Sequence, residues 1–364
     1  MTPSLLSAFK ETNIRTKSDQ REDISRNVFN FFVSVQVFRI FTFVWIYWTI
    51  QKFILLQDRP KEIFWFNDKL VSWIMPALPG ETLFYTIAGI AIAANLVQLV
   101  FLRNMVIVQL VLALCLLWLN LPHWGYGFLS HVNHTLLLSH LFLIFVPVSR
   151  HLLQAPDKYV HQAINWFYAG ILFTYTLAGL WKVPSLLFKL VTFSPDAHWL
   201  HPYGALFNSF VSYRNFDLNF ELETIFTEHV LLWQVSFLIV VYLQSISIFG
   251  AFRQPLRPWI GLLLIIFHVM NMLVFLTYFV VATLLIVCLF TPYSLILQPL
   301  YKRYYAVINS ISEASVVKEP AEYQTAFENY RNKIKESNYY LSGILFLPGL
   351  RTASRLLHYL RHKR

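Results

Sequence analysis

The chain has 364 residues, of which 57% are hydrophobic and 13% are charged, and its formal net charge is +10. These proportions exclude an ordinary soluble protein, in which roughly 25% of residues are charged. Several apolar runs of about 20 residues, the length of one bilayer crossing, instead predict an all-α, polytopic membrane bundle with no large soluble domain. Basic flanks that face anionic lipid explain the positive charge better than a nucleic-acid surface does.

Eight apolar segments within residues 28–298 predict a transmembrane domain of about eight helices. They are Val28–Ile50, Leu83–Leu102, a third that ends near Asn120, His131–Val148, Ala163–Val183, His229–Phe249, and two in the run Trp259–Leu297, which is nearly twice the length of one crossing and is divided near Leu276–Tyr278. A basic arm, residues 1–27, precedes them. A polar tail, residues 299–364, follows and ends in a basic amphipathic pattern typical of a helix on an anionic membrane surface.

The positive residues predict the orientation. The basic arm and the basic tail both belong on the cytoplasmic side, which requires an even number of spans. With eight spans, the fourth begins and the fifth ends on the extracytoplasmic side, so His134 and Lys182 are expected at the same depth. The longest connection, residues 184–227, lies on that side too, and it is long enough to form a lid or a re-entrant segment.

Asn133, His134 and Lys182 are polar residues inside apolar segments, where an ionisable group is costly unless it has a partner. Burial disfavours the charged form of a lysine, and a neutral Lys182 is a base for a weak acid such as a hydroquinone. Alternatively, Lys182 extends to interfacial water. His134 would bond Lys182 or a substrate oxygen and Asn133 would orient it, or both residues simply join helices through hydrogen bonds.

Three further polar side chains are candidates for a substrate site. His268 and Asn271 are three residues apart on one face of the seventh span, where they line a cavity or hold helices together. Arg39, in the first span, neutralises the carbonyl end of a helix or an acidic partner, or it contacts substrate directly. No metal site is expected, because no histidine pair has the spacing of a helical zinc motif and the two cysteines form no such motif.

At these residues the sequence resembles the transmembrane domain of the vitamin K-dependent γ-carboxylase and its bacterial relatives, the HTTM (horizontally transferred transmembrane) proteins. Three short motifs occur in the order of that family, namely Asn133-His134-Thr135-Leu136, Ala178-Gly179-Leu180-Trp181-Lys182-Val183 and Phe267-His268-Val269-Met270-Asn271. In the family, the histidine of the first motif is associated with the active site. The second motif reads Ala-Gly-Val-Lys-Lys-Leu, and its second lysine is taken as the base that deprotonates vitamin K hydroquinone.

The resemblance implies that Lys182 and His134 are catalytic and that Asn133, His268 and Asn271 line the substrate site. Trp181 stands where the family has its first lysine. The implied substrate is vitamin K hydroquinone or a related menaquinol, with oxygen and carbon dioxide as co-substrates. The implied location is a bacterial inner membrane.

The implied reaction is epoxidation of the quinol, with or without coupled carboxylation of a peptide glutamate. The animal enzyme docks its peptide on a large lumenal domain that is not expected in this sequence, so a separate docking subunit would have to supply that surface. Two functions of other classes stay open. One is a non-catalytic membrane partner in the maturation or export of a secreted peptide, and the other is a quinone or lipid carrier.

Overall fold

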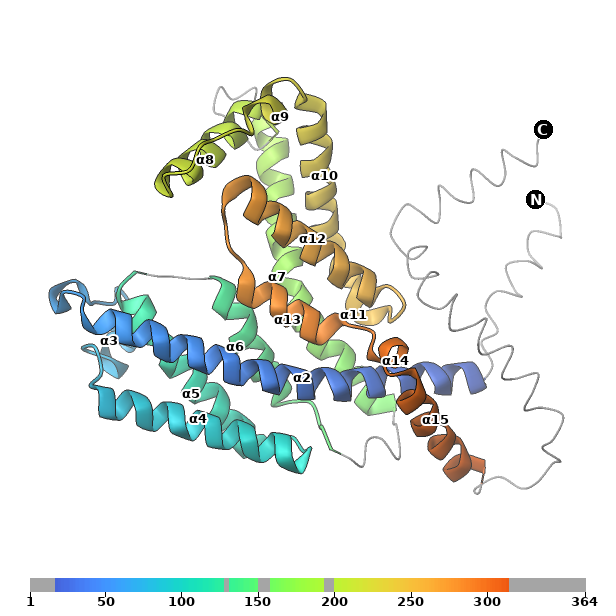
Figure 1. The fold of residues 1–364 in the computed structure, drawn as a ribbon. Coiled ribbons are helices and arrows are strands. Elements are labelled where there is room, and N and C mark those ends of the chain that lie inside the picture. Colours follow the sequence, from blue (N-terminus) through green and yellow to red (C-terminus); the bar gives the residue numbers. More distant parts are fainter. Residues whose placement is uncertain (1–16, 128–130, 150–157, 193–199, 314–364) are drawn as a thin grey trace, which may run out of the picture.

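The computed structural model describes residues 17–127, 131–149, 158–192 and 200–313, and in this part of the chain every regular element is a helix (Figure 1). The elements are α2 (Lys17–Gln57), η1 (Lys61–Ile63), α3 (Lys69–Ile74), α4 (Glu81–Phe101), α5 (Val106–Gly125), α6 (His131–Leu143), α7 (Lys158–Val191), α8 (Pro202–Asn215), α9 (Glu223–Thr227), α10 (Val230–Ile246), α11 (Phe249–Phe252), α12 (Arg257–Phe275), α13 (Val280–Phe290), α14 (Tyr293–Ile296) and α15 (Gln298–Glu313). The all-α prediction is confirmed. The predicted basic helix at residues 340–364 lies outside the described residues.

Each of the eight predicted apolar segments contains a helix, in the order α2, α4, α5, α6, α7, α10, α12 and α13. Five of them, α2, α4, α5, α7 and α12, are long and apolar enough to cross a membrane. The other three are shorter, because α6 has 13 residues, α10 has 17 and α13 has 11. The described chain is therefore a helical bundle with five candidate membrane spans, and the eight crossings remain a prediction.

The first span is longer than predicted. α2 begins at Lys17, so the end of the predicted basic arm is already helical. Ser25, Arg26 and Asn27 are buried in the bundle although the sequence around them is polar. Buried polar groups of this kind need hydrogen-bond partners, and Asn27 finds them on α7 and α12.

The fifth span also continues beyond its predicted end. α7 passes through Pro184 and ends at Val191, so the predicted helix end at Val183 is wrong. A proline removes one backbone hydrogen bond from a helix, but packing on either side can hold the helix together. Leu186, two residues after the proline, is buried in an apolar cluster with Phe226 and Trp233, and this burial favours continuation of the helix.

The last apolar run divides where the sequence predicts. α12 ends at Phe275, Leu276 has a left-handed φ of 50°, and α13 begins at Val280. A left-handed residue stops an α-helix because the chain leaves the helical path there. The hydroxyl of Tyr213, on α8, donates a hydrogen bond of 2.7 Å to the carbonyl of Leu273, so α8 binds carbonyl groups that the end of α12 leaves free.

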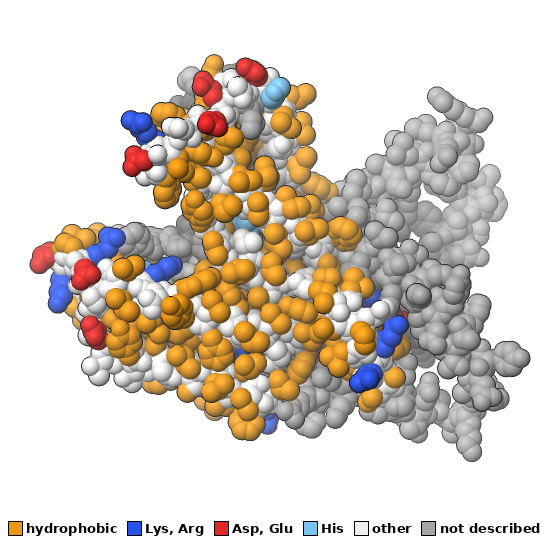
Figure 2. Space-filling view, viewed as in Figure 1, with side chains coloured by type: hydrophobic (Ala, Val, Ile, Leu, Met, Phe, Trp, Pro, Cys, Tyr) orange, Lys and Arg blue, Asp and Glu red, His pale blue; other side chains and the backbone are white. Residues whose placement is uncertain are grey.

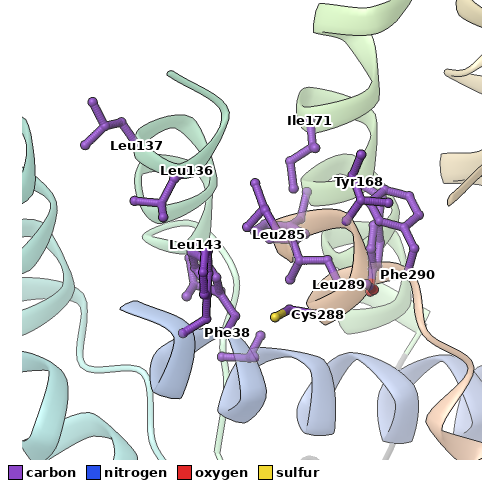
Figure 3. Close-up of a cluster of buried hydrophobic side chains, with 14 of the residues drawn as sticks. Phe38, Leu136, Leu137, Leu143, Tyr168, Ile171, Leu285, Cys288, Leu289 and Phe290 are labelled. Atoms are coloured by element: carbon purple, nitrogen blue, oxygen red, sulfur yellow. The ribbon is translucent and has the colours of Figure 1, made fainter. Parts of the chain in front are cut away.

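The helices do not share one direction. In Figure 1, α2 and α4 run across the view, whereas α7 and α10 run up it. α2 is the central element, since it packs against α4, α5, α7 and α13. The main core lies where α2, α6, α7 and α13 meet, and Figure 3 shows Phe38, Leu143, Ile171 and Leu285 converging there.

The predicted long loop, residues 184–227, is largely helical in its described part. It contains the end of α7 and the helices α8 and α9, which stand with α10 at one end of the molecule (Figure 1). Figure 2 shows acidic side chains both at that end and at the end of the molecule near α3, and apolar side chains spread over the middle. Tyr203 and Phe207 of α8 are exposed, which suits a helix at a membrane interface.

Candidate functional site

Lys182 lies on the side of α7 that packs against α10. Its Nζ donates a hydrogen bond of 2.6 Å to Oε1 of Gln244 on α10. The two helices approach closely because residue 179 is a glycine, and a Cβ at Gly179 would lie 2.4 Å from the backbone nitrogen of Ser245. The half-buried lysine is therefore held by a neutral amide on a tightly packed neighbouring helix.

Trp181 points the other way. It is 81% exposed, and its neighbour Leu180 is also exposed, on a helix long and apolar enough to cross a membrane. An exposed tryptophan on such a helix faces lipid, and it lies beside the predicted base in the sequence.

His268 lies on the same side of α7 as Lys182, at a different depth. It is buried, and its Nε2 lies 2.9 Å from the hydroxyl of Tyr175 on α7. Tyr175 is two helical turns before Lys182, or about 10 Å along the helix. Nδ1 of His268 has no hydrogen-bond partner among the described residues. Asn271 instead donates a bond of 2.8 Å to the carbonyl of Phe267 in its own helix.

Asn133 and His134 lie in a different part of the bundle, where α6 meets α2 and α5. Nε1 of Trp45 donates to Oδ1 of Asn133 at 3.1 Å, and Nδ2 of Asn133 donates to Oδ1 of Asn120 at 2.8 Å. The ring of His134 packs edge-on against Trp124, with 5.4 Å between the ring centroids. Asn133 thus makes interhelical hydrogen bonds, which is one of the two roles expected for it.

Replacement of Asn133 by leucine tests that interhelical role. We expect a loss of about 1–3 kcal/mol of stability, because the Trp45 N–H and the Asn120 amide oxygen would be buried without these partners. The melting temperature of the purified protein, followed by circular dichroism, measures the loss. Asn271→Leu is the control, since the described bond of Asn271 stays within one helix. Equal losses in the two variants would contradict the expectation.

Arg39 is fully buried in the middle of α2, with an exposed fraction of 0%. Its Nη2 donates a hydrogen bond of 3.2 Å to Oε1 of Gln98 on α4, and its backbone carbonyl accepts one of 2.8 Å from Nδ2 of Asn95. The prediction of a helix carbonyl end or an acidic partner is therefore wrong, because the partner is a neutral amide. Direct contact with substrate remains a prediction.

The predicted site residues thus fall into two groups. Lys182 and Trp181 lie on α7, and His268 and Asn271 lie on α12, which contacts α7 through His268. The other group, Asn133, His134 and Arg39, lies among α2, α4, α5 and α6. Lys182 bonds Gln244 rather than His134 in this structure.

Sequence reasoning missed the partners of these residues. Gln244 and Gln98 were passed over, although each is a long amide inside an apolar helix. Tyr175 was missed for a different reason, because a tyrosine in a membrane helix is common and only the fold brings it to His268. Gln244 and Gln98 could have been found from the sequence, because a polar side chain within an apolar segment needs a hydrogen-bond partner on a neighbouring helix.

A second buried arginine, Arg257, joins four helices at the start of α12. Its Nη1 donates to Asn27 at 2.7 Å, and its Nη2 donates to Asn165 at 3.0 Å and to the carbonyl of Ala251 at 2.7 Å. Its Cζ lies 3.8 Å from the ring centre of Tyr168. A small pocket lined by Arg257, Tyr168 and Gln254 opens beside it. Arg257 was not identified as a candidate site residue from the sequence.

Within residues 17–127, 131–149, 158–192 and 200–313, no three His, Cys, Asp or Glu side chains come together as a set that could hold a metal ion. Comparison of the chain with known protein families, with curated proteins and with solved structures found no match. The fold and the composition therefore define the chain as a helical membrane protein, and any function for it has to be argued from the residues described above.

Proposed function

We propose that the chain is an integral membrane enzyme that oxidises a reduced quinone, vitamin K hydroquinone or a related menaquinol, with Lys182 as the base. The observation that supports this most is the bond of 2.6 Å from Lys182 to the amide oxygen of Gln244. A carboxylate in that place would hold the lysine as an ammonium ion. A neutral amide orients the amine without fixing its charge, so Lys182 is able to exchange a proton.

In the proposed reaction, Lys182 takes the hydroxyl proton of the quinol and leaves a quinolate anion. The ring carbon of that anion then adds molecular oxygen, which is the oxidant. One oxygen atom stays on the ring as the epoxide, and the other leaves as water with the two quinol hydrogens. The balance is quinol plus oxygen to quinone epoxide plus water, and the lysine ends the cycle as a free amine. A site poor in water protects the basic intermediates from quenching.

The surroundings of Lys182 suit such a substrate. Trp181 and Leu180 are exposed on a membrane helix, which gives an apolar tail a route from the bilayer. His268, which contacts Tyr175 two helical turns from Lys182, has an Nδ1 without a partner among the described residues, and in the proposal this nitrogen bonds a quinol oxygen. The resemblance also implies a catalytic role for His134, but His134 packs on Trp124 apart from Lys182, so the proposed reaction uses Lys182 as its base without His134.

The second part of the proposal is that oxidation of the quinol is coupled to carboxylation of a peptide glutamate by carbon dioxide. It requires a peptide-docking surface, which we assign to a separate subunit. The proposed setting is a bacterial inner membrane, with eight crossings, both chain ends in the cytoplasm and Lys182 toward the outer face. The basic arm and tail of the sequence support this orientation.

Substitution of Gln244 tests the proposed role of the neutral partner. Purified protein receives the quinol, oxygen and bicarbonate, and quinone epoxide is measured by chromatography. We expect Gln244→Glu to lose at least about 10²-fold in epoxide formation, as Lys182→Ala does, because a carboxylate would keep the lysine protonated. Gln244→Leu removes the orienting amide without adding a charge, so its epoxide formation should fall between those of Gln244→Glu and the wild type.

Lys189→Ala, a lysine substitution on the same helix, is the control for these variants. It should match the wild type. Activity in Lys182→Ala would contradict the proposal. A folded wild type that forms no epoxide would favour a non-catalytic partner, or a carrier if it still binds the quinol.

A further inference from the structure

Arg39 and Arg257 show the same side chain in two buried environments. Every nitrogen of the Arg257 guanidinium has an acceptor, since Nε also donates to the carbonyl of Gly250 at 3.3 Å. The guanidinium of Arg39 makes one hydrogen bond, to Gln98, and its Nε and Nη1 have no partner among the described residues. The fold thus satisfies one buried guanidinium and leaves the other largely unsatisfied.

Other unpartnered polar atoms gather near Arg39. Gln36, one helical turn earlier on α2, has neither a donor partner nor an acceptor partner for its amide. Oδ1 of Asn95 and Oε1 of Gln109 are also buried without a partner. Together with Nε and Nη1 of Arg39, these are six of the seventeen such atoms in the described part of the chain. Asn95 bonds the Arg39 carbonyl, and Gln109 is linked to α2 through His140 and Thr42, so these residues form a polar network between α2, α4, α5 and α6.

His140, which bonds Thr42 on the same helix as Arg39, does not compensate the charge of Arg39. The Thr42 hydroxyl donates to the carbonyl of Phe38 at 2.9 Å, so it accepts from Nε2 of His140 at 3.0 Å. Nδ1 of His140 then accepts from Nε2 of Gln109 at 3.1 Å. Both ring nitrogens are used, and the ring is a neutral imidazole. No carboxylate is among the described partners of Arg39 either.

A buried cation without a counter-charge is costly, and inside a membrane helix it marks a functional site. We propose that Arg39 anchors a binding site for a small anion between α2, α4, α5 and α6, separate from Lys182. Nε and Nη1 of Arg39 and the amide nitrogen of Gln36 donate to the anion. Oδ1 of Asn95 and Oε1 of Gln109 accept from a water molecule that accompanies it. Three donors on two side chains match a small anion such as chloride or formate.

Thermal unfolding in different sodium salts tests the site. The purified protein is kept in uncharged detergent, and sodium gluconate is replaced stepwise by sodium chloride or formate at constant ionic strength. We expect the melting temperature of the wild type to rise saturably by on the order of 2–4 °C, because an anion that binds only the folded state stabilises it. Arg39→Met should show no such rise. In gluconate it should melt at or above the wild type, since it lacks the uncompensated charge.

Arg257→Lys is the matched control, because it alters a buried arginine that the fold already satisfies. It should melt at a lower temperature than the wild type and keep the full response to chloride. A response that persists in Arg39→Met would overturn the proposal. So would an Arg39→Met protein that melts below the wild type in gluconate or does not fold, because Arg39 would then be a structural brace. Absence of radioactive chloride binding to the wild type would overturn it as well.

Discussion

Arg257→Met is expected to lower the stability of the protein by about 3–5 kcal/mol, one of the largest effects of any single substitution in the described chain. The variant removes four hydrogen bonds and leaves Asn27, Asn165 and the carbonyls of Gly250 and Ala251 without them. Each unsatisfied buried group costs about 1–3 kcal/mol. The packing of the guanidinium on the Tyr168 ring is lost as well.

The measurement is the melting temperature in detergent, compared with that of Arg253→Met. Arg253 lies four residues earlier, in the turn between α11 and α12, and is exposed, so the same chemical change there should have a small effect. Similar melting temperatures for the two variants would mean that the contacts of Arg257 contribute little to the fold.

Gly179→Ala is expected to impair both stability and activity. A Cβ at this position would lie 2.4 Å from the backbone nitrogen of Ser245 and 2.8 Å from the backbone carbon of Gln244. Backbone atoms move only if α10 moves, so the variant should lose about 1–3 kcal/mol by overpacking. The same displacement carries Gln244 away from Lys182, and epoxide formation should fall with it.

Gly89→Ala is the matched control for this prediction. Gly89 also lies inside an apolar helix, but an added Cβ there meets nothing within 4 Å. Alanine favours a helix by about 1 kcal/mol relative to glycine, so this variant should be as stable as the wild type or more stable, with normal activity. If Gly179→Ala behaved in the same way, close contact between α7 and α10 would not be what positions Gln244.

The existence and order of the helices could be predicted because an apolar run of the right length has few other structures available in lipid. The division of the last run near Leu276 was predictable for a similar reason, since the run was too long for one crossing. The end of α7 could not be predicted in this way. Pro184 is a strong stop signal locally, but the burial of Leu186 against distant residues outweighs it.

The candidate site was less accessible to sequence reasoning. A polar residue in an apolar segment costs free energy unless it has a partner, and Lys182, Asn133 and Arg39 were identified as candidates on this ground. Which of them meet depends on how the helices cross. Their directions differ in Figure 1, whereas the sequence reasoning placed His134 and Lys182 together from depth alone. The amide partners Gln244 and Gln98 were predicted by neither argument. Gln244 bonds Lys182 and Gln98 bonds Arg39, and the two residues of each pair are 59 or more residues apart in the chain.

The most direct test of the central claim follows the oxygen atoms. Purified wild-type protein and Lys182→Ala are each given vitamin K hydroquinone under oxygen-18 gas, and the quinone product is analysed by mass spectrometry. If Lys182 is the base of a quinol epoxidase, the wild type forms an epoxide that carries the oxygen label, and Lys182→Ala forms none. Equal amounts of labelled epoxide from both proteins, or none from a folded wild type, would contradict the account.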